Sequence, residues 1–493
     1  MSPRQRHPNS SIRACQGKGA DVQGRSAWHR PAKAVIVAGV LASTLALAFG
    51  PASATPSPTS SAGGPPGVPA EVLPPVSGEI PASPVPDDAS LVASLASALT
   101  VGPLGADVTA SVVDAATGAV IFSRGAERPQ QPASTLKIFT GVTVLRAMGD
   151  DTRLTTRVVT GKKPGTIVLS GGGDATLTRL PTDPTDLPAG LGARTSSLTE
   201  LATLTAQSLR ARRLTNVTLL IDDSEFTGPS LAPSWPNAYL YSGFVSRVSA
   251  LSADGGRVSA GSPWRDADPA LAAGQFFAQR LIAEGIVVQG QVARVDGSKA
   301  AGASQISSVQ SPTIADMVER MLTLSDNDLA EALAHIAGGK LGGEASFAGG
   351  VRAVERTLLA LGVSTSGVTV ADGSGLSALN RVTSDSLAHI LAITAFDAPA
   401  VGATVGELWP VASGLPIAGV TGTLAPRFVG LGTSVGRGIV RAKTGTLRGV
   451  DCLAGLVRDR YGRLLAFAFV ADRAPGPVLA ARNALDRAAS LLI

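Results

Sequence analysis

The sequence predicts an α+β protein, an α/β sandwich in which helices cover an antiparallel sheet and a large domain is inserted into the chain. Three observations predict this class. Strand-like runs occur near both ends of the folded part of the 493-residue chain. Helix-like runs with apolar residues at three- and four-residue spacing accompany them. Between the two ends, residues 151–305 have a separate pattern of short strands, helices and turns.

The N-terminal end of the folded part supplies a hairpin and a helix. Two β-type runs flank the turn Asp114–Gly118, which predicts a β-hairpin. The following stretch, 131–145, has Ile138 and Val142 at helical spacing and Pro132 before them as a helix-start signal. We therefore expect the hairpin to lead directly into a helix with one buried face.

The C-terminal end supplies three strands and a last helix. The strand-like segments are 438–445, 451–459 and 464–472, and the segment 477–493 has helical spacing. Polar turns separate the strands, which is typical of antiparallel sheets. We expect one antiparallel sheet to be built from both ends of the chain.

The stretch between the two ends has elements of its own. Strand-like runs occupy residues 165–174 and 216–226, and helix-like runs occupy residues 197–213 and 269–285. We expect the folded chain to divide into a first part of the main domain, an inserted domain and a second part of the main domain, at residues 89–150, 151–305 and 306–493.

Positive charge is concentrated in front of the folded part. The pI is about 9.5, but residues 1–54 hold seven Lys or Arg residues against a single acidic residue, Asp21. The rest of the chain is close to neutral. A nucleic-acid partner therefore has little electrostatic support.

The basic leader has the order of a secretory signal. An apolar run, Ala34–Phe49, is followed by the small residues Ala52–Ala54, which predicts a signal peptide over residues 1–54. The run is shorter than the roughly 20 residues that span a membrane, so we expect membrane contact only through an uncleaved leader. Residues 55–88, rich in Pro and Ser, predict a disordered linker. We expect an exported protein in the extracellular, cell-wall or periplasmic space.

Side chains for metal or histidine chemistry are scarce beyond the leader. His335 and His389 fall in helical stretches, and Cys452 falls in a strand-like run, where buried structural roles are the simplest expectation. No clustered pair of histidines supports a Ser-His-Asp triad or a zinc site. We expect neither a metal nor a cofactor.

A serine and a lysine at the start of the 131–145 helix offer another base. Ser134 and Lys137 are three residues apart and therefore lie on the same face, about one helical turn apart. The first turn of a helix disfavours a cation, whereas a neutral amine there can accept the proton of a serine hydroxyl. Desolvation and a second nearby cation both lower the pKa of a lysine. Alone, this pair is a weak motif.

A second motif, Ser325-Asp326-Asn327, follows a helical run. Ser, Asp and Asn are all preferred at helix caps, which would explain the motif without any chemistry.

A third motif, Lys443-Thr444-Gly445-Thr446, lies in a strand-like run. Gly445 would let a substrate backbone lie against the strand edge, and Lys443 with the threonine hydroxyls would bind an anionic terminus. A strand end with a turn glycine is the simpler explanation of this motif alone. The order Ser-x-x-Lys, Ser-x-Asn, Lys-Thr-Gly is a much stronger signal than any single motif.

With these three motifs, the sequence resembles the penicillin-recognising serine acyl-transferases. It is most similar in pattern to the D-alanyl-D-alanine carboxypeptidase/endopeptidase family, the low-molecular-mass class C penicillin-binding proteins. Longer strings carry the same resemblance, among them Leu169–Leu177, Ile221–Phe226, Asp372–Val382 and Leu415–Phe428. The resemblance covers residue 89 to the C-terminus and implies a β-lactamase/transpeptidase-like fold.

The resemblance implies catalytic roles for five residues. Ser134 would be the nucleophile and Lys137 its general base. Ser325 would relay a proton to the leaving amine, with Lys443 as the second cation. Asn327 would hold the amide of the substrate.

The resemblance also implies a substrate-binding strand. Thr444 and Thr446 would bind the terminal carboxylate, with Gly445 between them. The backbone N–H groups of Ser134 and Thr446 would form an oxyanion hole.

The implied substrates are peptidoglycan stem peptides ending in D-Ala-D-Ala, and the implied covalent inhibitors are β-lactams. A carboxypeptidase, with or without endopeptidase activity, is therefore the main hypothesis. A serine β-lactamase is a second hypothesis, although no Glu-x-x-Leu-Asn string follows Asn327 and only Glu331, Glu344 and Glu355 lie nearby. A wall-binding protein that keeps the motifs without turnover is a third.

Overall fold

A computed structural model describes residues 88–100, 102–182, 195–295, 303–398 and 401–493. The predicted signal peptide and, apart from Asp88, the predicted linker lie outside the described residues. All described residues belong to one unit of the chain, Glu79–Ile493. Among them, no helix combines the length and the apolar character needed to cross a membrane.

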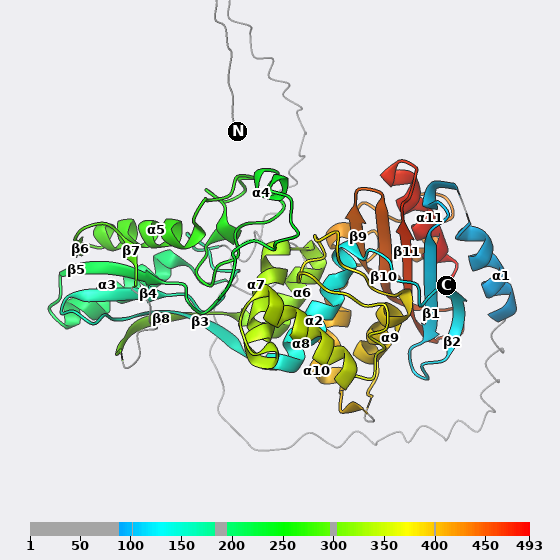
Figure 1. Cartoon of the computed structure of the whole chain (residues 1–493), viewed down its shortest axis with the longest axis horizontal. Coiled ribbons are helices and arrows are strands. Elements are labelled where there is room, and N and C mark those ends of the chain that lie inside the picture. Colours follow the sequence, from blue (N-terminus) through cyan, green and yellow to red (C-terminus); the bar gives the residue numbers. More distant parts are fainter. Residues whose placement is uncertain (1–87, 101, 183–194, 296–302, 399–400) are drawn as a thin grey trace, which may run out of the picture. The chain divides into compact units, whose positions relative to one another are not determined.

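Both ends of the described chain contribute to one sheet of five strands in the order β2-β1-β11-β10-β9 (Figure 1). Every neighbouring pair in it is antiparallel, which confirms the predicted fold class. The predicted hairpin and the three predicted C-terminal strands are present as β1 (Val108–Asp114), β2 (Val120–Arg124), β9 (Arg441–Leu447), β10 (Val450–Arg458) and β11 (Leu464–Asp472).

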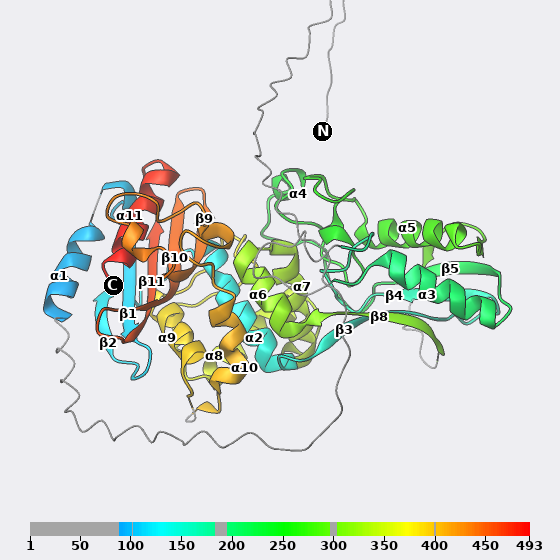
Figure 2. The same ribbon diagram turned by 180° about the vertical axis from the view of Figure 1, so that it is seen from behind.

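Helices cover both faces of this sheet. Successive residues of a strand point to opposite faces, so Phe467 and Phe469 of β11 pack into one core and Ala466 and Ala468 into another. Because neither face meets water, β11 is apolar along its length instead of alternating. The covering helices are α1 (Asp88–Ala98) and α11 (Val478–Ser490) on one face, and α9 (Ser384–Ala395) on the other (Figures 1 and 2).

Helix α2 (Lys137–Met148) lies at the centre of the helical layer. The spacing of its apolar residues predicted a buried face, and Ile138 and Val142 are buried as expected. The burial goes further than the spacing indicates and includes every residue from Lys137 to Leu145, because small and polar residues also pack: a Cβ on Gly141 would meet a Val318 methyl at 3.2 Å. The helices around α2 are α6 (Ile314–Leu324), α7 (Asn327–Ala337), α8 (Phe347–Ala360), α9 and α10 (Val405–Ser413).

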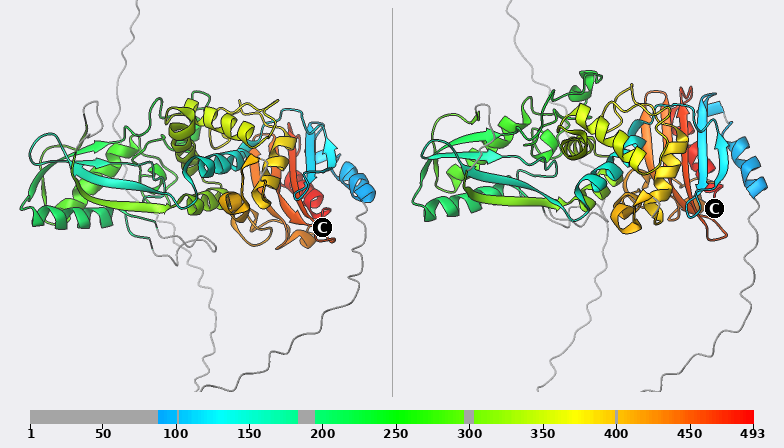
Figure 3. Two further views of the ribbon diagram at one scale, coloured as in Figure 1. Left: turned by 90° about the horizontal axis from the view of Figure 1, so that it is seen from below. Right: turned by 60° about the horizontal axis from the view of Figure 1, so that its bottom comes forward.

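The middle of the chain forms a second sheet with its own core (Figure 3). Its six strands follow the order β6-β5-β4-β3-β8, with β7 paired to β5. Strands β4 and β5 are parallel because helix α3 connects them. Strand β8 extends past residue 305, where the insert was predicted to end. The elements are β3 (Arg153–Thr160), β4 (Thr166–Ser170), α3 (Leu198–Ala211), β5 (Asn216–Asp222), α5 (Pro269–Ala283), β6 (Val287–Val288), β7 (Ala293–Arg294) and β8 (Gln305–Thr313).

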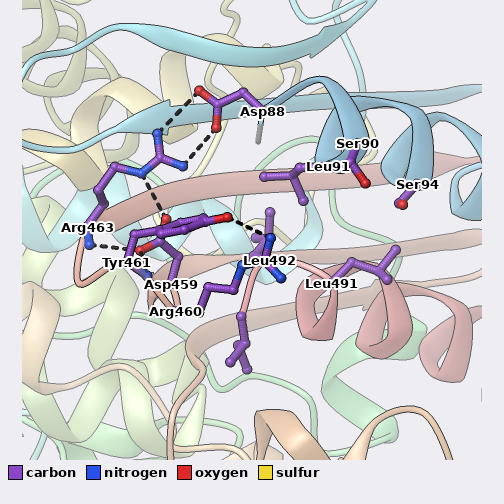
Figure 4. A pocket seen from close by; sticks show the side chains of 11 residues that line it. Asp88, Ser90, Leu91, Ser94, Asp459, Arg460, Tyr461, Arg463, Leu491 and Leu492 are labelled. Carbon is purple, nitrogen blue, oxygen red and sulfur yellow. Dashed lines mark hydrogen bonds and ion pairs between the residues drawn. The ribbon is translucent and has the colours of Figure 1, made fainter. Parts of the chain in front are cut away.

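A pocket of about 190 Å³ lies beside the start of α1 (Figure 4). The Arg463 guanidinium donates to Asp88 at 2.8 Å and to Asp459 at 2.8 Å. These bonds tie the first described turn of the chain to the turn between β10 and β11. No residue of the three motifs lines this pocket, so it belongs to the scaffold.

Candidate active site

Ser134 lies in a short 3-10 helix, Ala133–Leu136, and α2 begins at Lys137. The sequence predicted both residues in one helix, and the structure places them on either side of this junction. A 3-10 helix has three residues per turn, so Ser134 and Lys137 still face the same side. Ala133 has φ 46°, a conformation that is uncommon outside glycine and concentrated at functional sites.

The Lys137 amine has three partners from three parts of the chain. Its Nζ lies 3.1 Å from Ser134 Oγ, 2.7 Å from Asn327 Oδ1 and 2.6 Å from the carbonyl oxygen of Ser374. The side chain is fully buried. Burial lowers the pKa of Lys137 to about 8, although nearby carboxylates, Glu331 first among them, oppose the shift.

These partners suit both protonation states of the amine, since an ammonium can donate one N–H to each of the three oxygens. A neutral lysine has two N–H bonds and one lone pair. Asn327 Oδ1 and the Ser374 carbonyl can only accept, so they take the two N–H bonds. The lone pair is then left for the Ser134 hydroxyl, which makes Lys137 able to remove the hydroxyl proton.

The Ser325-Asp326-Asn327 motif forms the turn between α6 and α7. Asp326 is the N-cap of α7 and accepts a bond from the Leu329 N–H at 3.0 Å. The capping explanation is therefore correct for Asp326. Ser325 ends α6 with φ 57°, and Asn327 opens α7. The Ser325 hydroxyl is bonded to Lys443 of β9.

Lys443 joins this turn to strand β9. Its Nζ donates to Ser325 Oγ at 2.9 Å and to the carbonyl oxygen of Thr444 at 2.9 Å. Burial, and then the charge of Lys137, lower the pKa of Lys443 well below its ordinary value. Each of the two lysines is thus bonded to one serine hydroxyl of the site.

The absence of a side chain at Gly445 makes room for the turn that contains Pro132 and Ala133. A Cβ at this position would meet the Pro132 carbonyl oxygen at 2.6 Å and the Ala133 Cβ at 3.2 Å. The missing side chain at Gly445 therefore leaves room for the turn that carries Ser134. Below it, Cys452 is paired with Gly445 across the strands and is buried, which confirms the predicted structural thiol.

The two threonines of the third motif are already hydrogen-bonded. Thr444 Oγ1 donates to Thr423 Oγ1 at 2.9 Å, and Thr446 Oγ1 donates to Asp451 at 3.0 Å. The Arg482 guanidinium donates to Thr446 Oγ1 at 3.2 Å. Arg482 also pairs with Asp451, Nε to Oδ1 at 3.6 Å. The three motifs did not identify this arginine beside Thr446.

Glu331 is a second residue that the motifs missed as part of the site. Its carboxylate is buried one turn beyond Asn327 and accepts the backbone N–H groups of Gly373 at 2.9 Å and Ser374 at 2.8 Å. Burial, and then the charge of Asp372, raise the pKa of Glu331 to about 8. Glu331 thus holds the turn whose Ser374 carbonyl accepts from Lys137. In the sequence, Glu331 follows Asn327 by four residues in a helical run, which places both on one face of the helix and could have identified Glu331.

Asp372 holds the other side of the same turn. Its two oxygens accept the N–H groups of Gly375 at 2.8 Å and Ser377 at 2.6 Å, and the Trp235 indole N–H at 2.8 Å. The segment Asp372–Val382 is one of the strings that carry the family resemblance. In the structure its first residue, Asp372, holds the backbone of a turn in place. Two carboxylates fasten the turn that supplies an acceptor to the base.

The histidines of the described chain have structural contacts. His335 is buried between Phe226 and Phe347, with ring centroids 5.0 and 4.7 Å away. Burial lowers its pKa to about 4. His389 pairs with Asp385 on α9. In the part of the chain that the structure describes, no three His, Cys, Asp or Glu side chains are grouped to hold a metal ion.

Comparison with protein families places these residues in context. The family model described as "D-Ala-D-Ala carboxypeptidase 3 (S13) family" matches residues 91–264 and 262–491. A carboxypeptidase DacB of Mycolicibacterium smegmatis is 37% identical over 416 residues, which cover 83% of this chain and 85% of that protein. A D-alanyl-D-alanine carboxypeptidase of an Actinomadura strain is 29% identical, covering 76% and 79%.

A solved structure has the same fold. Penicillin-binding protein 4 of Haemophilus influenzae matches with a TM-score of 0.64 at 21% identity, over 80% of this chain and 97% of that one. The same protein complexed with a β-lactam matches with a TM-score of 0.57 over the same shares, also at 21% identity. At this identity the likeness shows the fold alone.

Replacing Glu331 should change both stability and the titration of Lys137. In Glu331→Gln the amide can accept only one of the two backbone N–H bonds, so we expect the free energy of unfolding to fall by about 1–3 kcal/mol. Near and above pH 8, where Glu331 is ionised, a charge that raises the pKa of Lys137 is also removed. The acid limb of any Lys137-dependent reaction should therefore move to lower pH. Urea unfolding and a pH–rate profile measure the two effects.

Glu355→Gln is the matched control, because Glu355 is an exposed carboxylate on α8. It should leave both measurements unchanged. An unshifted acid limb in Glu331→Gln would contradict the electrostatic part of the argument, and unchanged stability would contradict the clamp.

Proposed function

The chain belongs to the D-Ala-D-Ala carboxypeptidase 3 (S13) family, and from this premise we propose that it is a serine carboxypeptidase that removes the terminal D-alanine of peptidoglycan stem peptides through a Ser134 acyl-enzyme. The observation that carries the proposal is the buried Lys137 amine. Its Nζ bonds to Asn327 Oδ1 and to the Ser374 carbonyl oxygen, and it lies 3.1 Å from Ser134 Oγ. The relatives named D-alanyl-D-alanine carboxypeptidase and carboxypeptidase DacB support the substrate class.

Acylation begins with proton transfer to the base. The neutral Lys137 amine takes the hydroxyl proton as Ser134 Oγ bonds to the carbonyl carbon of the penultimate D-alanine. The backbone N–H groups of Ser134 and Thr446 bind the developing oxyanion, an interaction worth about 3 kcal/mol per donor.

The C–N bond then breaks, and the departing amine must gain a proton. The Ser325 hydroxyl, which is bonded to Lys443, supplies it. Asn327 orients the substrate amide, and Thr444, Gly445 and Thr446 line the strand that receives the terminal carboxylate. Water then cleaves the Ser134 ester, which releases the shortened stem peptide and restores the hydroxyl.

β-Lactams are expected to acylate Ser134 in the same way and to remain bound, and the β-lactam complex of the structural relative supports this expectation. Rapid β-lactam turnover would need a carboxylate free to activate water. Both oxygens of Glu331, the nearest acidic residue after Asn327 that the sequence offered for this role, accept backbone N–H bonds. This arrangement favours the carboxypeptidase over the β-lactamase.

The acyl-enzyme is directly testable. Labelled penicillin should form a stable adduct on Ser134, and the enzyme should release D-alanine from an N-acyl-D-Ala-D-Ala peptide. Ser134→Ala should abolish both, while Ser94→Ala, at an exposed position on α1, should retain both. Fast hydrolysis of the penicillin would indicate a β-lactamase, and the absence of any adduct in the unsubstituted protein would overturn the proposal.

The rate of acylation should depend on pH in one direction. Lys137 must be neutral to act, and its pKa is lowered to about 8. The second-order rate constant for acylation should therefore fall about tenfold per pH unit below that value and level off above it. A rate constant that stays flat from about pH 6 to pH 10 would exclude Lys137 as the base.

Export is part of the proposal, supported by the basic and apolar leader at residues 1–54. We expect the mature chain to begin at Thr55 and to be recovered outside the cytoplasm. N-terminal sequencing of the protein from a fractionated culture measures this. An intact leader on protein recovered from the cytoplasm would contradict it.

A further inference from the structure

Exposed aromatic side chains gather in one segment of the insert. The whole chain has only three Tyr and four Trp residues. Among the described residues, the exposed aromatic side chains are Tyr241, Phe244, Trp264, Phe396 and Trp409. The first three of these lie between residues 241 and 264, and they are 74%, 55% and 63% exposed. We call these three side chains the aromatic patch.

The two loops that carry the aromatic patch are fixed to each other. Arg265, which follows Trp264, donates from its guanidinium to the carbonyl oxygen of Gly243 at 2.8 Å. Gly243 precedes Phe244 in the chain. The same guanidinium pairs with Asp328 of α7 at 2.9 Å, and the Arg265 side chain is only 4% exposed. A buried cation thus joins both loops to α7.

The aromatic patch is also connected to the candidate site. The Phe244 carbonyl oxygen accepts a bond from Asn327 Nδ2 at 2.8 Å. Asn327 Oδ1 accepts from the Lys137 amine at 2.7 Å, and that amine lies 3.1 Å from Ser134 Oγ. A short series of hydrogen bonds therefore runs from the patch to the nucleophile. A ligand that covers the patch lies beside the substrate bound at Ser134.

Aromatic rings on a surface suit one class of ligand in particular. Apolar surface exposed beside a site marks a place where a ligand or partner binds. A flat, rigid ring packs well against the C–H face of a sugar, and the Tyr O–H and Trp N–H groups remain free to hydrogen-bond at the edge of the ring. In the substrate class proposed above, the stem peptide is attached to a glycan strand. The position of the patch and its chemistry both favour a saccharide.

We propose that the aromatic patch binds sugar rings of the glycan strand to which the stem peptide is attached. This inference rests on the proposed function and extends it to the choice of substrate. Stem peptides on a glycan strand would then be cleaved more efficiently than the same peptides free in solution. No bond is made or broken at the patch, and the acyl transfer takes place at Ser134.

The test compares two substrates with one peptide sequence ending in D-Ala-D-Ala. In one the peptide is free, and in the other it is attached to an oligosaccharide of alternating N-acetylglucosamine and N-acetylmuramic acid. In the Tyr241→Ala/Trp264→Ala double variant, kcat/KM for the saccharide-linked substrate should fall on the order of tenfold, because two packing surfaces are lost. The value for the free peptide should stay the same, so the ratio of the two is measured.

A binding measurement separates recognition from turnover. Calorimetry on the Ser134→Ala protein should detect binding of the peptide-free oligosaccharide. Adding the double substitution should weaken the Kd by a factor similar to the change in the kcat/KM ratio. Trp409→Ala is the matched control, since this tryptophan is 50% exposed and lies on α10, outside the insert. It should change neither the Kd nor the ratio.

Three outcomes would overturn the saccharide site. The first is an unchanged ratio together with an unchanged Kd in the double variant. The second is an equal loss on both substrates, which would indicate damage to the active site. The third is self-association of the chain that the double substitution abolishes, without any saccharide binding. If the unsubstituted protein forms no penicillin adduct and cleaves neither substrate, the proposed function itself fails, and calorimetry still decides whether the patch binds the saccharide.

Discussion

The burial of a single amine, that of Lys137, is the constraint on which the rest of the site depends. An ammonium group is costly to place in an apolar interior, so burial favours the neutral form that can act as a base. The surrounding carboxylates oppose this effect, and the balance leaves the pKa near 8. Helix α2 must therefore be enclosed on all sides, which requires the whole helical layer and the sheet beneath it.

A neutral buried amine also needs acceptors for its N–H bonds, and the fold brings them from distant parts of the sequence. Asn327 comes from the start of α7, and Ser374 comes from a turn that two buried carboxylates hold in place. The nucleophile turn and the Ser325 turn both contain a non-glycine residue with positive φ. Such conformations persist only where the surrounding packing enforces them, and here that packing includes the close contact at Gly445.

The inserted region is hydrogen-bonded to residues of the candidate site. Its segment around Phe244 and Ser246 bonds to Asn327 and Asp328, and its Trp235 bonds to Asp372. Movement of this segment would therefore change the position of Asn327, which accepts a bond from Lys137. Its residues Asp254, Arg257 and Arg265 line a cavity whose wall also includes Ser325 and Asn327.

The sequence by itself determined the main elements and the residues that meet at the candidate site. Its two strand-rich ends predicted the antiparallel sheet. The three short motifs predicted which side chains would meet, because their order along the chain is a much stronger signal than any one motif. It could not determine how fully α2 is buried. Helical spacing identifies the apolar face of a helix, but it does not show which elements pack against the remaining faces. Only the tertiary structure decided that Gly445 accommodates the nucleophile turn, that Glu331 clamps the acceptor of Lys137, and that the Phe244 carbonyl of the insert accepts a bond from Asn327. These are contacts between segments far apart in the chain, and no local pattern of residues encodes them.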